Sequence, residues 1–200
     1  MAARISKGFT LVESIFVIII LGLAMITLVS VLYPQIAQSA KPYYEVRASA
    51  LANSLMTEIL ARNFDEHSDH DGGKYRCGEL GPDSMTTISC TDDSALGREE
   101  PVALFNDVDD YIGCWYTSSD SRQRCTHPAD KQYPLSDIFG NTISDDYQGF
   151  KAEVSINYDY DCDLLVKADA CTTKLFKKIT VVITASQYGD FTFVAHKGNF

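Results

Sequence analysis

The residues best placed to do chemistry are one acid at the edge of an apolar run and six cysteines far beyond it. Glu13 stands where the run Ser14–Tyr33 begins, and this run carries no charged residue. A carboxylate that enters a bilayer is costly, so an ionisable group at this place is a functional hypothesis. The alternative is a glutamate that reaches water near the lipid headgroups. The chemistry of the sequence leaves both interpretations open.

The apolar run has the length of a membrane span. Its 20 residues would cover about 30 Å as a helix, which matches the hydrocarbon core of a bilayer. Met1–Gly8 contains Arg4 and Lys7 but no acid, which favours a cytoplasmic N-terminus and an exported C-terminus. A removable secretory signal would have a shorter apolar region, although Ala37-Gln38-Ser39 could imitate its cleavage site. A plain membrane anchor is a further alternative.

The residues around Glu13 form a specific motif. Lys7-Gly8-Phe9-Thr10-Leu11-Val12-Glu13, followed by the apolar run, resembles the signature of type IV prepilins and of type II secretion pseudopilins. The resemblance implies cleavage between Gly8 and Phe9 by a prepilin peptidase, and N-methylation of the new Phe9 amine. It also implies that Glu13 pairs with the N-terminal amine of a neighbouring subunit. Because each charge alone is costly in hydrocarbon, such a pair would fix the register of assembly.

Further segments resemble minor pilins of the mannose-sensitive haemagglutinin (MSHA) pilus. They are Tyr33-Pro34-Gln35, Arg47–Leu51, Ser54–Arg62, Asp107–Tyr111 and Gly113–Trp115. The resemblance implies a structural subunit, not an enzyme and without a cofactor, that primes or caps a pilus used in attachment and biofilm formation. Its partners would be other major and minor pilins through the N-terminal helix, the prepilin peptidase and the inner-membrane assembly platform. The subunit would first lie in the inner membrane with its head in the periplasm, and later in the extracellular pilus.

Two other functions stay open at this point. A type II secretion pseudopilin has the same N-terminus, and a tip adhesin or DNA-binding subunit would use the head itself. The chain has 17 basic and 27 acidic residues and a formal net charge of -10, which argues against a general nucleic-acid surface. No nucleic-acid partner is therefore expected. The sequence has no glycine-rich phosphate loop and no GxSxG motif, and nothing in it indicates a catalytic triad.

The expected fold class is α+β: a long N-terminal hydrophobic helix packed on an antiparallel sheet with disulfide-stapled loops. We expect a leader at 1–8, a membrane and assembly helix at 9–33 and a head at 34–200. In the head the helix would continue to about residue 64, a loop-rich region would follow to about 148, and the sheet would occupy about 149–200. Pro34 and Pro42 predict kinks, and Pro42 is a candidate first-turn residue of a second helical half.

Periodicity predicts the core of the head. A stripe with helical spacing predicts an amphipathic helix: Ala48, Leu51, Ala52, Leu55, Met56, Ile59 and Leu60. Period-two alternation predicts strands at Phe150–Tyr160, Lys178–Ser186 and Asp190–His196, with a hairpin turn at Ser186–Asp190. The residues expected to meet between helix and sheet are Leu55, Ile59, Val154, Ile156, Val181 and Ile183.

All six cysteines lie beyond the apolar run, where an exported compartment favours disulfides. They allow 15 connectivities, and the sequence alone cannot choose among them. Our hypothesis is sequential pairing: Cys77–Cys90, Cys114–Cys125 and Cys162–Cys171.

Two acidic clusters are candidate calcium sites. Asp69-His70-Asp71-Gly72 follows Asp65 and Glu66, and a second cluster is Asp159–Asp163. Neither has the spacing of an EF-hand loop, so solvated acidic loops are the preferred interpretation and no metal site is assigned. His67 and His70 could share a zinc ion if they lay on a helix.

One group of aromatic residues stands out in the middle of the chain. Trp115, with Tyr111 and Tyr116, could form a patch that contacts sugar or protein. Burial in the core is the preferred interpretation.

Overall fold

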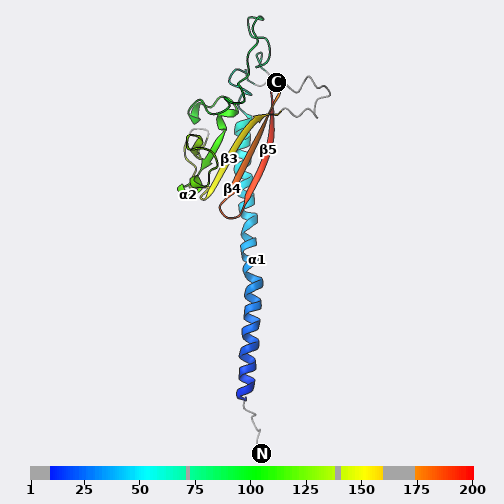
Figure 1. The fold of residues 1–200 in the computed structure, drawn as a ribbon, viewed down its shortest axis with the longest axis vertical. Helices are drawn as coiled ribbons and strands as arrows, with labels where there is room; N and C mark the ends of the chain where they lie inside the picture. Colours follow the sequence, from blue (N-terminus) through cyan, green and yellow to red (C-terminus); the bar gives the residue numbers. More distant parts are fainter. Residues whose placement is uncertain (1–9, 71–72, 138–140, 160–173) are drawn as a thin grey trace, which may run out of the picture. The chain divides into compact units, whose positions relative to one another are not determined.

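The computed structural model describes residues 10–70, 73–137, 141–159 and 174–200 (Figure 1). Contacts divide the chain into two compact units, Met1–Tyr43 and Tyr44–Phe200. The described part of the first unit is almost entirely helix, and the second, which we call the head, combines helix and sheet. The expected α+β class is confirmed.

Helix α1 (Leu11–Leu60) runs without a break through both units. Its first turn is capped by Thr10, whose Oγ1 accepts a hydrogen bond from the N–H of Glu13 at 3.3 Å. The helix passes through Pro34 and Pro42, so the expectation that Pro42 starts a second helical half is wrong. Extension of an existing helix is cooperative, and long helical stretches on both sides tolerate the N–H donor that each proline removes.

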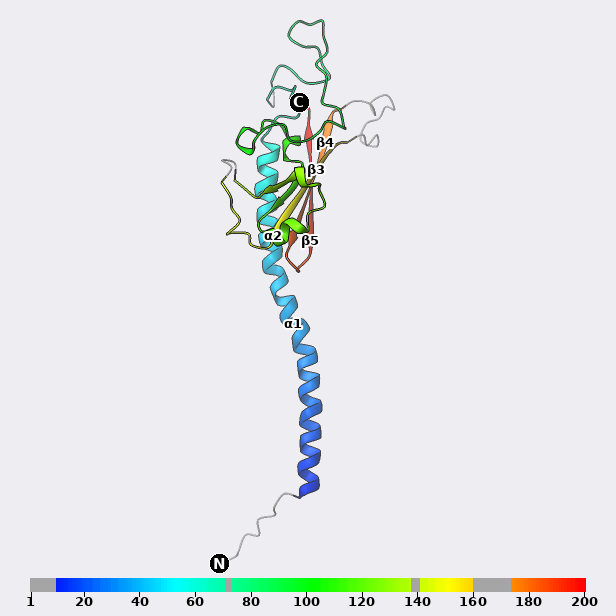
Figure 2. The ribbon, with the colours of Figure 1, turned by 60° about the vertical axis from the view of Figure 1, so that its left-hand side comes forward.

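The head contains a five-stranded sheet in the order β2-β1-β3-β4-β5. Strands β3 (Phe150–Tyr158), β4 (Phe176–Ala185) and β5 (Asp190–Gly198) are antiparallel neighbours, as predicted. Figures 1 and 2 show the C-terminal turns of α1 along one face of these strands.

The sheet as a whole is mixed, because a parallel pair of strands at one edge extends the predicted antiparallel strands. Strand β1 (Gly113–Tyr116) pairs antiparallel with β3 but parallel with β2 (Gln132–Pro134). Helix α2 (Ser119–Gln123) lies in the crossover that a parallel pair requires. Strands this short show no clear period of two, which is why the turn-rich middle of the sequence did not reveal them.

A close approach of backbones fixes one residue of β1. Gly113 has a φ of 150°, and a Cβ atom there would lie 2.7 Å from the carbonyl oxygen of Lys131 and 2.8 Å from the Tyr133 ring. Only glycine fits without a shift of one strand. Three short 3₁₀ helices, η1 (Val102–Leu104), η2 (Asp109–Tyr111) and η3 (Ala129–Lys131), complete this part of the head.

The predicted hairpin turn between β4 and β5 is confirmed. The N–H of Ala185 donates to the Gly189 oxygen at 3.0 Å, and the N–H of Tyr188 donates to the Ala185 oxygen at 2.9 Å. Ser186 and Gly189 both have positive φ angles, 51° and 116°, which lets the chain reverse within a few residues.

The core of the head lies between α1 and the sheet. All six residues expected to meet there are buried: Leu55, Ile59, Val154, Ile156, Val181 and Ile183. The predicted stripe on α1 is also buried, except for Leu60, which is half-buried. The head therefore has a hydrophobic core of its own.

Candidate functional site

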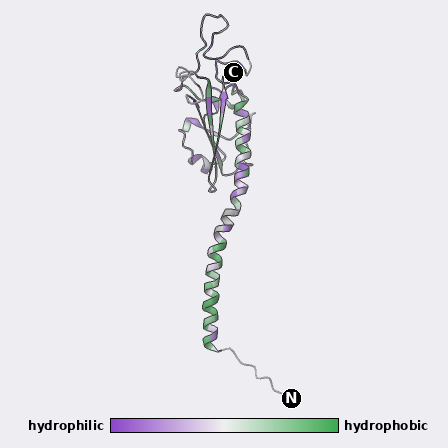
Figure 3. Cartoon of the chain, turned by 90° about the vertical axis from the view of Figure 1, so that its right-hand side faces the viewer, coloured by the Kyte–Doolittle hydropathy of each residue, from purple (hydrophilic) through white to green (hydrophobic). Residues whose placement is uncertain are grey.

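The first candidate site is the apolar part of α1. Leu11–Tyr33 is a stretch of 23 residues with a mean hydropathy of 3.0, and its most apolar part is not buried. Figure 3 shows this stretch in the colour of hydrophobic residues. At 1.5 Å per residue it is about 35 Å long, so by length and composition it could span a membrane. Signal sequences near an N-terminus have the same two properties.

The serine and threonine hydroxyl groups within this stretch are satisfied inside the helix. Ser14 donates to the Leu11 oxygen at 2.9 Å, Thr27 to the Ala24 oxygen at 2.8 Å and Ser30 to the Thr27 oxygen at 2.8 Å. Such back-bonding leaves none of these three hydroxyl donors free to face an apolar medium.

Glu13 lies in the first turn of α1 and is exposed. Within residues 10–70, 73–137, 141–159 and 174–200, no side chain pairs with its carboxylate. The spacing Thr10-x-x-Glu13 is that of a capping box, a local signal that the sequence analysis missed, and the structure contains its Thr10 half. The positive end of the helix dipole also stabilises a carboxylate at this position.

Two predicted site residues cannot be placed. Gly8 and Phe9 lie outside the described residues. Cleavage between them and methylation of Phe9 stay predictions.

Two of the three predicted disulfides are confirmed, namely Cys77–Cys90 and Cys114–Cys125. No free cysteine occurs in the described part of the chain. Cys162 and Cys171 lie outside it, so their pairing stays a prediction. The confirmed bridges close short loops in the turn-rich middle of the head, where cross-links restrict the unfolded chain.

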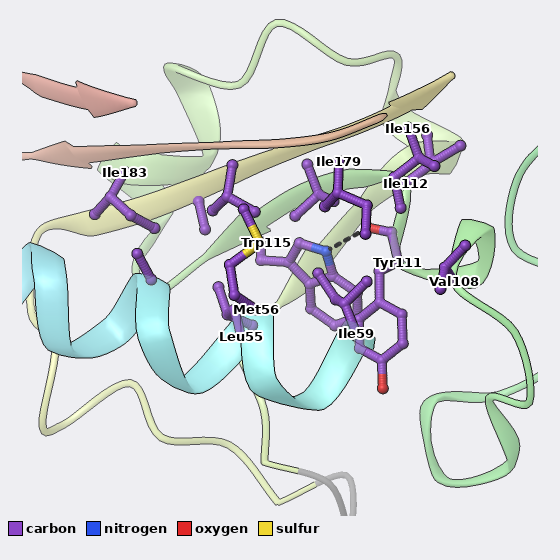
Figure 4. Close-up of a cluster of buried hydrophobic side chains, with 14 of the residues drawn as sticks. Leu55, Met56, Ile59, Val108, Tyr111, Ile112, Trp115, Ile156, Ile179 and Ile183 are labelled. Carbon is purple, nitrogen blue, oxygen red and sulfur yellow. Dashed lines mark hydrogen bonds between the residues drawn. The ribbon is translucent and has the colours of Figure 1, made fainter. Parts of the chain in front are cut away.

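The aromatic residues of the middle region are mainly core. Trp115 and Tyr111 are each 2% exposed, and the indole Nε1 of Trp115 donates to the Tyr111 oxygen at 3.0 Å (Figure 4). Tyr116 is half-buried, with the Arg122 guanidinium 5.3 Å from the centre of its ring. Burial is confirmed for Trp115 and Tyr111, and the contact patch is not.

The first acidic cluster does not act as one unit. Asp65 is buried, whereas Asp69 and His70 are exposed, and Asp71 and Gly72 lie outside the described residues. His67 follows the end of α1 in a turn, so the helix that a zinc pair with His70 would need is absent from this described segment. Instead, His67 Nδ1 lies 3.4 Å from Asp65 Oδ1.

Only the first residue of the second acidic cluster can be placed. Asp159 pairs with His196, with 3.0 Å between Oδ2 and Nε2. The other members, Tyr160–Asp163, lie outside the described residues.

A different acidic group forms in space. Oxygen atoms of Glu66, Glu99 and Glu100 lie within 4.8 Å of one another, close enough to hold a divalent cation. Burial, followed by the charge of Asp109, raises the pKa of Glu99, and burial followed by Asp110 raises that of Glu100. The sequence did not indicate this group because Glu66 is far from the other two along the chain.

The head also contains a buried ionic network that the sequence analysis missed. Lys177 on β4 is fully buried, and its Nζ lies 3.3 Å from Asp65 Oδ2 and contacts Asp109 Oδ1. Asp65 also accepts hydrogen bonds from the Tyr158 hydroxyl and the Thr91 N–H, each at 3.0 Å. Burial alone would raise the pKa of Asp65, but Lys177 and these donors hold it below its usual value.

The sequence signal that could have revealed this network is the alternation of inward and outward residues along β4. Lys177 has the same alternation as the buried Ile179 and Val181, so a period of two places its side chain on the inner face. An inward lysine requires a buried acid as its partner.

No protein family, no curated protein and no solved structure matches this chain. The N-terminal apolar helix, the helix segment packed on a sheet and the two disulfides are consistent with a pilin-like fold.

Proposed function

We propose that this chain is a minor pilin, a structural subunit that primes or caps an MSHA-type type IV pilus. The observation that carries the proposal is an acid, Glu13, in the first turn of an exposed apolar helix of 23 residues. Gly8 and Phe9 stand just before it with the residue types of a prepilin cleavage site. Among the MSHA minor pilins, we propose that this chain corresponds to the D subunit, which the quoted segments resemble.

The apolar surface of Leu11–Tyr33 needs a cover. Its large side chains are 41–77% exposed, and burial of apolar surface is the main favourable term in association. In the inner membrane, lipid provides this cover, and in a pilus the helices of neighbouring subunits replace the lipid. The energy for that exchange comes from a separate assembly motor.

We propose that Glu13 determines the register in which the helices of neighbouring subunits pack. A carboxylate inside a bundle of apolar helices is costly without a cation. After cleavage, the Phe9 amine of a neighbouring subunit supplies one, and a misplaced subunit leaves both charges unpaired. Removal of the leader also removes Arg4 and Lys7, the cations that favour a cytoplasmic N-terminus.

The head is adapted to an exported compartment. Cys77–Cys90 and Cys114–Cys125 are disulfides, which persist in oxidising surroundings such as the periplasm. We propose that Cys162–Cys171 is a third disulfide, and that the head lies in the periplasm before assembly and on the pilus afterwards. Its role is structural rather than catalytic, without a cofactor or nucleic acid.

The mature N-terminus tests the proposal directly. Mass analysis of the chain from isolated pili should find N-methyl-Phe9 as the first residue. A bulky replacement of Gly8 should block processing, because the peptidase must fit the small residue before the cut, and the chain should then keep its precursor mobility. A mature chain that keeps Met1, or begins far beyond Phe9, contradicts the proposal.

A paired variant tests the register step. Glu13→Ala should be processed normally, but its amount in sheared pili should fall about tenfold or more, because one buried charge loses its partner. Glu45→Ala is the matched control, since Glu45 is an exposed acid on the same helix. Equal incorporation of both variants would defeat the pairing argument.

A deletion strain separates this function from its two alternatives. Loss of surface attachment with normal protein secretion supports the minor pilin. Loss of exoprotein secretion indicates a type II pseudopilin. Specific binding of glycans or DNA by the purified full-length chain indicates a tip adhesin or DNA-binding subunit.

A further inference from the structure

The segment Leu96–Tyr111 of the head folds around three buried acids. Asp107, Asp109 and Asp110 are each at most 1% exposed. Buried carboxylates are costly unless they are hydrogen-bonded, paired with a cation or protonated. How each of the three meets this requirement differs.

Two of the acids hold the loop closed through its backbone. Asp109 Oδ2 accepts a hydrogen bond from the N–H of Gly97 at 3.4 Å. Asp110 accepts one from the N–H of Glu99 at 3.2 Å through Oδ1, and one from the N–H of Asn106 at 3.0 Å through Oδ2. These bonds tie both ends of the loop to η2.

The third acid, Asp107, has an oxygen without a donor. Its Oδ1 accepts hydrogen bonds from the N–H groups of Asp109 and Asp110 at 3.1 and 3.3 Å. Its Oδ2 is buried, and no N–H or O–H group of the described residues donates to it. A buried carboxylate oxygen without a donor is costly, and a bound proton removes the charge that makes it so.

The charges around Asp107 agree with a bound proton. Asp109 and Asp110 face it from its own segment, and Lys177 faces it from β4. Lys177 is also shared with Asp65, so one ammonium serves several buried acids. Burial first, and then Asp109, raise the pKa of Asp107 to about 8, against the opposing effect of Lys177.

A metal ion fits this place less well than a proton. Calcium requires about six to eight oxygen ligands, whereas most carboxylate oxygens here already accept hydrogen bonds from backbone N–H groups. The position of a cation beside Asp109 is already taken by the Lys177 ammonium.

We propose that the Asp107 carboxyl group binds a proton when the Leu96–Asp110 loop is closed, so that the loop opens more readily as pH rises. The closed loop packs on aromatic core residues. It carries Phe105, whose ring centre lies 6.1 Å from that of Trp115, and Arg98, whose guanidinium lies 4.5 Å from the centre of the Tyr133 ring. The proposal does not depend on the function in a pilus.

The direction of the effect follows from linkage. Asp107 has a higher pKa in the closed loop, about 8, than its ordinary value of 3.8, which it regains when the loop opens. Between these two values the closed loop binds one proton more than the open loop. The equilibrium constant for opening therefore rises up to about tenfold per pH unit in this window and is flat above it.

Amide hydrogen exchange measures this opening. The full-length protein in detergent micelles is compared at about pH 5.5, 6.5 and 7.5, with correction for the intrinsic pH dependence of exchange. In the wild type, the protection factors of the Gly97, Glu99 and Asn106 amides should fall about tenfold per pH unit. In Asp107→Asn, which mimics the neutral acid, they should be independent of pH. Asp83→Asn, an exposed acid on another loop, should keep the wild-type slope.

Two further measurements guard against a variant that fails to fold. Wild-type protein at neutral pH should show the infrared carbonyl band of a buried protonated carboxylic acid, and Asp107→Asn should lack it. Asp109→Asn removes the negative charge that, after burial, favours the proton on Asp107, so the pH range over which protection falls should end at a lower pH than in the wild type although Asp107 is intact.

Three results would overturn the proposal. They are a flat wild-type profile, an unchanged slope in Asp107→Asn, and protection that depends on added calcium chloride at neutral pH. The last result would assign a cation, not a proton, to the cluster.

Discussion

Glu13 at the start of the apolar helix and Asp65 in the head are both carboxylates next to apolar residues, but among the described residues only Asp65 has side-chain partners. Asp65 has a lysine, a tyrosine hydroxyl and a backbone N–H as partners within the head. Glu13 has no side-chain partner in the described part of the chain, only a helix start. The head therefore supplies partners for its own buried carboxylate, whereas the described residues supply no side-chain partner for Glu13.

The apolar side chains show the same contrast. Ile59 is fully buried between α1 and the sheet, whereas Ile18, on the same helix, is 69% exposed. The same type of side chain is therefore buried in the fold of the head and left exposed on the apolar helix. Substitutions that treat the two regions alike should have different consequences.

The largest expected effect comes from breaking the network of the head. Lys177→Met keeps much of the side-chain volume but leaves Asp65 and Asp109 without their cation. Removal of one partner of a buried ion pair costs about 3–5 kcal/mol of unfolding free energy. Denaturant unfolding can be followed by fluorescence, because Trp115 is the single tryptophan and lies in this core.

The pH dependence of the same variant makes the test specific. In the wild type the lowered pKa of Asp65 contributes stability that is present above 3.8 and is lost as pH falls below it. Without Lys177, the pKa of Asp65 should rise, because burial raises it and the lysine no longer opposes burial, so the loss of stability as pH falls below 3.8 should become smaller. Lys178→Met, at an exposed neighbour on β4, should leave both stability and slope unchanged. Equal losses of stability in the two variants would show that the buried Lys177 contributes no more to stability than the exposed Lys178.

The two regions also differ in how well their structure could be predicted. Helical and strand periods identified the buried residues of α1, β3, β4 and β5, because each of these elements is long enough to repeat its pattern. The burial of Leu55, Ile59, Val181 and Ile183 could be predicted for that reason, and all four are buried. The apolar helix was equally clear, since its signal is composition over a continuous stretch.

The rest depends on contacts between residues far apart in sequence. Strands β1 and β2 have only four and three residues, so their place in the sheet follows from pairing with β3 and with each other. The same holds for Lys177 with Asp65, and for Glu66 with Glu99. Local patterns specify elements, whereas long-range pairing specifies which polar groups meet.

A matched pair of isoleucine substitutions sharpens the comparison. Ile59→Ala removes a buried side chain and leaves a cavity, so the head should lose about 2–5 kcal/mol of unfolding free energy. Ile18→Ala removes exposed surface and should leave the unfolding of the head unchanged. The measurement is denaturant unfolding of both full-length variants in the same detergent.

Incorporation into pili gives the opposite ranking under the proposed function. Ile18→Ala should reduce the amount of subunit recovered from the pilus fraction relative to the folded pool, because apolar contact with neighbouring helices is lost. A substantial change in head stability caused by Ile18→Ala would mean that the two regions are not energetically separate.

The smallest effect concerns a single hydroxyl group in each region. The Tyr111 hydroxyl donates to Glu58 Oε1 at 2.8 Å and accepts from Arg62 Nε at 3.1 Å, whereas Tyr33 is 77% exposed. Tyr111→Phe should cost about 1 kcal/mol, because Glu58 and Arg62 lose a bridging partner but still reach water. For a chain of this size that loss lowers Tm by roughly 2–4 °C. Tyr33→Phe should leave Tm unchanged, and an equal decrease in both variants would remove the distinction between a hydroxyl group with partners in the head and an exposed hydroxyl group on the apolar helix.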